Sequence, residues 1–170
     1  MPQAHRARWL AAATAAVVSA NAAATPALCK QDEDVVFSCV AGRKLISVCA
    51  SHDWNADSGL LQYRYGSNAR TEIAVPAAEM KLPPNRSASS GVLMFSGGGG
   101  AYLRFSAHDY DYVVYTAVGS SWGEKAGVTV QRDGKTRSNR FCTGAVTSTI
   151  GPELFRKAGF AEDSQGFELP

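Results

Sequence analysis

Hydrophobic and polar residues alternate along most of this chain, in short runs that turn-forming residues separate. In the clearest run, alternate residues from Tyr110 to Val118 fall on one side of an extended strand. Asp133-Gly134 joins two further runs, and an Asp-Gly pair favours a hairpin because both central residues of a type I′ turn need positive φ. The runs predicted to form strands are 35–40, 44–50, 60–65, 71–75, 92–96, 101–106, 110–118, 128–132 and 135–142.

Few helical patterns separate these runs. The prediction is therefore an all-β fold, a small antiparallel β-barrel or sandwich of about eight strands with one short C-terminal helix. That helix is expected to begin near Pro152 and to end at Gly159. Residues 76–90 contain three prolines and are expected to form a long loop.

The four glycines at 97–100 are expected to form a flexible hairpin loop, with a surface role for the loop as the alternative. A phosphate-binding loop is excluded, because no Gly-Lys-Ser/Thr follows and the next residues favour a strand rather than a helix.

The N-terminus has the three parts of a secretory signal peptide, which predicts a signal at 1–24 and one mature domain at 25–170. A basic start precedes an uncharged apolar stretch at 9–20, and small residues allow cleavage after Ala22 or Ala24. A bilayer core needs about 20 apolar residues, so this stretch is too short to cross it. We expect no membrane span after signal removal and a periplasmic or secreted protein.

All four cysteines, Cys29, Cys39, Cys49 and Cys142, follow the predicted cleavage sites. An even number in an exported chain predicts two disulfides. Free or metal-bound thiols are the alternative, which the spacing disfavours because there is no C-x-x-C pair. We expect neither a metal nor a cofactor.

The formal net charge of +2 includes Arg6 and Arg8, which belong to the predicted signal. Without them 15 basic and 15 acidic residues remain, so the mature domain is close to neutral. Nucleic-acid-binding proteins carry a clustered basic excess. We therefore expect no nucleic-acid partner.

The mature domain has two histidines, His52 and His108, each followed by an aspartate, Asp53 or Asp109. A secreted hydrolase built on one of them is an alternative function. Neither lies in a G-x-S-x-G or H-E-x-x-H motif, and adjacent strand residues point to opposite faces. We therefore expect surface histidines and a binding protein rather than an enzyme. The tyrosines of 110–115 could add an outward-facing surface for sugar or protein.

Six short motifs follow one another in a fixed order along two thirds of the chain. They are Phe37-Ser-Cys39, Gly42-Arg-Lys44, Ser96-Gly97 followed by Tyr102, Trp122-Gly-Glu-Lys125-Ala-Gly127, the hairpin around Gly134-Lys135, and Phe141-Cys142. This order resembles the C-type lysozyme inhibitor family of bacterial envelopes, whose members are similar to small antiparallel β-barrels. The chain differs by two additional glycines before Tyr102 and by the absence of a lipid-attachment cysteine.

The resemblance implies which residues bind a partner. In that family a loop serine and a lysine enter the lysozyme cleft. The resemblance implies that Ser96 and Lys125 take these two roles here, and that Gly97 and Tyr102 shape the loop. A lysine ammonium would pair with the two catalytic carboxylates of a glycosidase and so block its substrate. The expected function is an exported, non-enzymatic binding protein of the bacterial envelope, with lysozyme inhibition as its most specific form. The alternative is a structural or interaction module for another envelope component.

The resemblance also implies a disulfide between Cys39 and Cys142, which leaves Cys29 and Cys49 for the second. Cys29 precedes the first predicted strand and Cys49 ends its hairpin partner, so these two can lie close together.

Overall fold

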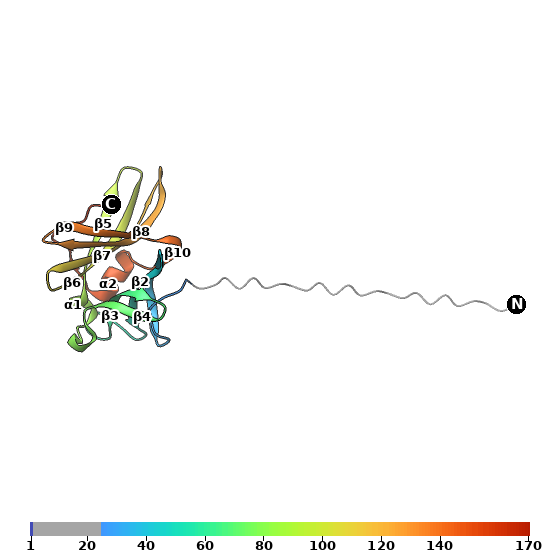
Figure 1. Cartoon of the computed structure of the whole chain (residues 1–170), viewed down its shortest axis with the longest axis horizontal. Helices are drawn as coiled ribbons and strands as arrows, with labels where there is room; N and C mark the ends of the chain where they lie inside the picture. Colours follow the sequence, from blue (N-terminus) through green and yellow to red (C-terminus); the bar gives the residue numbers. More distant parts are fainter. Residues whose placement is uncertain (2–24) are drawn as a thin grey trace.

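The computed structural model describes Met1 and residues 25–170, which fold into two packed β-sheets (Figure 1). Apart from Met1, the predicted signal peptide lies outside the described residues. The first sheet, sheet A, has the order β10 (Thr143–Ser148), β1 (Glu33–Ala41), β2 (Lys44–Ser51), β3 (Leu61–Ser67), β4 (Arg70–Val75). Sheet B has the order β11 (Ala161–Glu162), β5 (Ser89–Phe95), β6 (Gly98–Ala107), β7 (Tyr110–Gly119), β8 (Gly123–Arg132), β9 (Lys135–Phe141).

The predicted all-β class and C-terminal helix are confirmed. The sheets form a sandwich-like arrangement and do not close into a barrel, and α2 (Pro152–Ala158) is the predicted helix. The described residues form eleven strands rather than about eight, since short β10 and β11 lack an alternating apolar pattern. The expected loop at 76–90 contains η1 (Ala78–Met80) and α1 (Pro84–Ser87) and runs into β5.

The prediction that the four glycines form a flexible loop is wrong. Only Ser96 and Gly97 make the turn, because Gly98 already begins β6. A Cβ at Gly98 would overlap the carbonyl oxygen of Val118 on the neighbouring strand, and Gly100 is crowded in the same way. These glycines therefore allow two strands to approach closely rather than making a loop flexible.

The main hydrophobic core lies between the two sheets. Its largest fully buried side chains are at most 1% exposed, and the burial of each contributes about 1.5–3 kcal/mol to folding. Leu154 and Ala158 of α2 pack against the same core. The principal core residues are Phe37, Ile46, Leu61 and Tyr63 from sheet A and Leu103, Phe105, Val114 and Val128 from sheet B.

A second, smaller core lies on the outer face of sheet B, beneath the C-terminal segment (residues 163–170). Phe167 of this segment packs on the rings of Tyr102 and Tyr115, with centroid distances of 5.2 and 5.5 Å. Leu169 packs against the same cluster. Much of sheet B is therefore covered on both faces, by sheet A on one and by the C-terminal segment on the other.

Both expected disulfides are present, Cys29–Cys49 and Cys39–Cys142, and the described residues contain no free cysteine. Cys142 lies between the last strand of sheet B and β10 of sheet A, so its bond to β1 holds the two sheets together. Two disulfides indicate an oxidising extracellular or periplasmic compartment. Within the described residues, no helix has both the length and the apolar character needed to cross a membrane.

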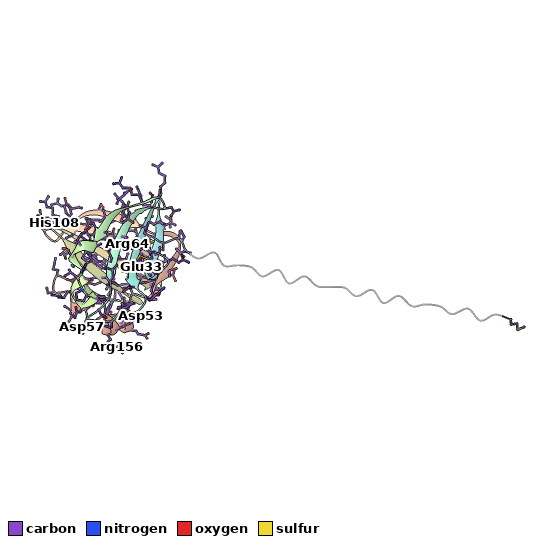
Figure 2. The ribbon with its side chains drawn as sticks, turned by 90° about the horizontal axis from the view of Figure 1, so that it is seen from below. Glu33, Asp53, Asp57, Arg64, His108 and Arg156 are labelled. Carbon is purple, nitrogen blue, oxygen red and sulfur yellow. A yellow bond between two sulfur atoms is a disulfide. The ribbon has the colours of Figure 1, made fainter. Side chains whose placement is uncertain are left out.

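A buried ion pair fixes the start of β1. Glu33 and Arg64 lie together in Figure 2, with both guanidinium ends bonded to the carboxylate at 2.6 and 2.7 Å. Burial alone would raise the pKa of Glu33, but hydrogen bonds from Arg64 and the Lys30 amide, with the charge of Arg64, lower it below its ordinary value.

Candidate partner-binding site

Two hairpin turns project together from one end of sheet B (Figure 1). We call this region the hairpin end, residues 92–98 and 118–125. The Ser120 amide donates a hydrogen bond to the Gly97 carbonyl at 2.8 Å, which ties the β7–β8 turn to the β5–β6 turn. Behind them, the Phe95 and Trp122 rings are 5.6 Å apart. The two turns therefore form one connected unit.

Three of the four predicted partner-binding residues belong to this end. Ser96 and Gly97 are exposed at the tip of the β5–β6 turn. Lys125 lies on β8 with its ammonium 5.1 Å from the centre of the Trp122 ring, which also packs against Phe95. The structure thus places Ser96 and Lys125 at the same end of the sheet.

The ammonium of Lys125 already has an internal partner. The residue is half-buried, and its Nζ donates a hydrogen bond of 3.1 Å to the Pro170 carbonyl oxygen. Trp122 covers the ammonium from another side through a cation–π contact. To meet carboxylates on a partner, Lys125 has to exchange the Pro170 oxygen for them.

Tyr102 does not reach the surface. It is 3% exposed, and its hydroxyl donates a 3.0 Å hydrogen bond to Asp163. Burial, together with that hydrogen bond, raises the pKa of Tyr102 to about 12. A Cβ at the opposite residue Gly91 would overlap its ring, so the aromatic side chain fills the space above a glycine. Tyr102 thus shapes the sheet below the tip and makes no surface of its own.

An exposed aliphatic patch on the hairpin end did not follow from the sequence motifs. Val92, Met94 and Val118 are 55%, 89% and 54% exposed. Met94 and Val118 both lie opposite Gly99, and Val92 is two residues from Met94, so all three share one face. That face is the inner one, because Val92 lies opposite the core residue Ala101. Here sheet B extends past sheet A, and its inner face meets solvent.

The outer edge of β5 is also open. In the described residues β11 pairs only with Ser89 and Ser90, so no strand covers 91–95 on that side. No charged residue occurs between Ser89 and Leu103. Exposed apolar edge strands attract other strands or proteins unless charges prevent it. The hairpin end thus combines an open edge with an aliphatic surface.

A buried cation holds the C-terminal segment on the outer face of sheet B. Arg104 is 2% exposed, and its Nε donates to Asp163 at 3.0 Å. Its other nitrogens bond to Gln131 at 2.6 Å, to Asp111 at 3.3 Å and to the Gly166 carbonyl at 2.8 Å. This network fixes the route by which the chain reaches Lys125. Its members lie far apart in the sequence, so no local motif marks them.

The two histidines are not gathered into a catalytic arrangement. His52 Nδ1 lies 2.7 Å from Asp34, not from its neighbour Asp53, and both side chains are about half exposed. His108 occupies the β6–β7 turn at the edge of the molecule, apart from Asp53 (Figure 2). Within residues 25–170, neither imidazole is hydrogen-bonded to a hydroxyl or thiol. Nothing in this geometry favours the hydrolase alternative.

No family model, no curated protein and no solved structure matches this chain.

Proposed function

We propose that this chain is an exported binding protein whose hairpin end docks onto another protein in the periplasm or outside the cell. The observation that carries the proposal is the patch of Val92, Met94 and Val118, three large aliphatic side chains exposed on one face. Burying each of them against a partner would contribute up to about 1.5–3 kcal/mol. Exposed apolar patches of this kind mark interaction sites.

The most specific partner is a C-type lysozyme. Support comes from the resemblance together with the position of Ser96 at the tip and Lys125 behind it. In such a complex the tip would enter the substrate cleft, and the ammonium of Lys125 would move from Pro170 to the catalytic carboxylates. Lys125 lies on the outer face of sheet B and the patch on its inner face, so a cleft that encloses the tip would meet the ammonium on one side and the aliphatic side chains on the other.

Lysis of bacterial cell walls by a C-type lysozyme, followed as loss of turbidity, tests the proposal. Micromolar domain (residues 25–170) should slow the lysis. Lys125→Ala should weaken inhibition about tenfold or more, because a charge-assisted contact is lost. Lys135→Ala, an exposed lysine at the opposite end of sheet B, should leave inhibition unchanged.

A second pair of variants separates the patch from the lysine. Met94→Ser should weaken inhibition, whereas Met80→Ser, which removes another exposed methionine outside the hairpin end, should not. Failure of the wild-type domain to inhibit at micromolar concentration would eliminate lysozyme as the partner. Equal effects of Met94→Ser and Met80→Ser would eliminate the hairpin end as the binding surface.

A further inference from the structure

A cavity of about 190 Å³ lies between the two sheets, near the end of sheet B opposite the hairpin end. It is bounded by β3 and β4 of sheet A and by β7, β8 and β9 of sheet B. An engineered cavity of about 150 Å³ accommodates benzene, so this one can hold a single ring with a few additional atoms. A wider surface hollow shares Ile73, Tyr110 and Tyr112 with it, so the two adjoin at the surface of the domain.

The walls of the cavity are suited to a flat apolar body. The Tyr63 and Tyr112 rings stack with their centres 5.1 Å apart and their planes 25° apart. Ile73, Val128 and Val130 supply aliphatic surface around them. Most small-molecule sites have this composition, apolar walls with a few placed polar groups.

The first placed polar group is the hydroxyl of Tyr63. Tyr63 is 1% exposed, and its hydroxyl forms no hydrogen bond with any residue of the described chain. It is not one of the fully enclosed side-chain atoms without a partner, which in residues 25–170 belong to Asn85, Tyr115 and Arg132, so it is accessible from the cavity that Tyr63 lines. Burial, with smaller contributions from Tyr112 and Tyr65, raises the pKa of Tyr63, so the hydroxyl stays protonated and can donate.

The second is the guanidinium of Arg140. It lines the cavity, and within residues 25–170 no carboxylate forms an ion pair with it. Its one hydrogen bond is to the adjacent Asn139 carbonyl, at 3.1 Å. No aspartate or glutamate lines the cavity. The polar part of the site therefore offers a positive charge and an unused donor.

We propose that this cavity binds a small organic acid, a carboxylate carried on a single ring or a short branched apolar body. The carboxylate would accept from the Tyr63 hydroxyl and pair with Arg140, while the apolar body would lie among the tyrosine rings. A sugar fits less well, because its hydroxyls need carboxylate or amide acceptors that the lining lacks. The site is separate from the hairpin end, so it holds or fails independently of lysozyme binding.

Isothermal titration calorimetry of the domain with benzoate and 3-phenylpropionate tests the site. Both should bind, while acetate (no ring) and benzyl alcohol (no charge) should bind about tenfold more weakly or worse. Arg140→Gln and Tyr63→Phe should each weaken benzoate binding by up to about tenfold and leave benzyl alcohol unaffected. Arg137→Gln, an exposed arginine on the same strand that does not line the cavity, is the matched control.

Three outcomes would overturn the proposal. The first is no heat of binding from either ring carboxylate at a ligand concentration of about 10 mM. That concentration is well above the dissociation constant expected for so small a ligand. The second is equal weakening by Arg140→Gln and Arg137→Gln, which would mean attraction to surface charge alone. The third is tighter binding of N-acetylglucosamine than of benzoate. If Tyr63→Phe does not fold, Arg140→Gln still tests the site, because Arg140 is exposed and its replacement should leave the fold intact.

Discussion

Two arginine–aspartate pairs in this domain have the same length and very different burial, which makes them a test of what burial contributes. Arg104 and Asp163 are 3.0 Å apart with side chains 2% and 3% exposed. Arg132 and Asp109 are also 3.0 Å apart, with side chains 43% and 67% exposed. The buried pair holds the C-terminal segment, whereas the exposed pair joins the β6–β7 turn to the end of β8.

Asp163→Asn keeps the shape of the side chain and removes its charge. Breaking a buried ion pair typically costs about 3–5 kcal/mol, because the remaining ion has lost its solvent and its partner. Asp111 lies 3.3 Å from Arg104 and keeps part of the compensation. We therefore expect a loss of about 3 kcal/mol in the free energy of unfolding, the lower end of that range. Asp109→Asn should cost less than about 1 kcal/mol, since solvent screens that pair.

Urea denaturation followed by tryptophan fluorescence and by circular dichroism measures both values. Asp163→Asn should also loosen the C-terminal segment, so amide exchange should accelerate in sheet B beneath Phe167. The reasoning is refuted if the two variants lose similar stability, because burial would then not decide the strength of the pair. Unchanged exchange in Asp163→Asn would show that other contacts hold the segment.

Two further predictions concern the cross-links and the pH dependence. Replacing both cysteines of the Cys39–Cys142 bridge by alanine should lower the free energy of unfolding by about 1.5 kcal/mol more than replacing both cysteines of Cys29–Cys49. The reason is that the first bridge joins residues 103 apart in the sequence and the second joins residues 20 apart, so the first restricts the unfolded chain more. Thermal or urea unfolding of the two variants measures the difference. Glu33 has a folded pKa below its ordinary value of 4.5, so its stabilising effect is present above that pH and is lost as the pH falls through the lower value. Glu33→Gln should be less stable at neutral pH and should lose less stability on acidification, in unfolding curves measured across pH 2–7.

Local features were predictable because their causes are local. The alternation from Tyr110 to Val118 and the Asp133-Gly134 turn specify a strand and a hairpin by themselves, and both occur in β7 and between β8 and β9. The glycines at 98–100 were misinterpreted because the constraint on them comes from carbonyls of the adjacent strand. A composition rich in glycine cannot distinguish a mobile loop from two strands in close approach.

The candidate site was predictable only in part, for the same reason. Ser96 and Lys125 were expected together from the resemblance, and the antiparallel pairing of β5 to β8 places them at one end. The partner of the Lys125 ammonium, 45 residues away at Pro170, follows from the path of the C-terminal segment over sheet B. That path depends on Arg104, whose contacts join residues from three separate stretches of chain.

The exposed patch follows from a mismatch in strand length between the two sheets. β6, β7 and β8 each have ten residues, whereas the strands of sheet A have six to nine. β5 has only seven residues, but its half with Val92 and Met94 pairs with the first residues of β6, at the hairpin end. Val92, Met94 and Val118 continue the inner face of sheet B, so their alternation is the same as that of core residues. They are exposed because no strand of sheet A extends far enough to cover them. A partner that supplies this missing layer would bury side chains already arranged as a core, which is why the hairpin end, rather than the histidines, is the surface to test first.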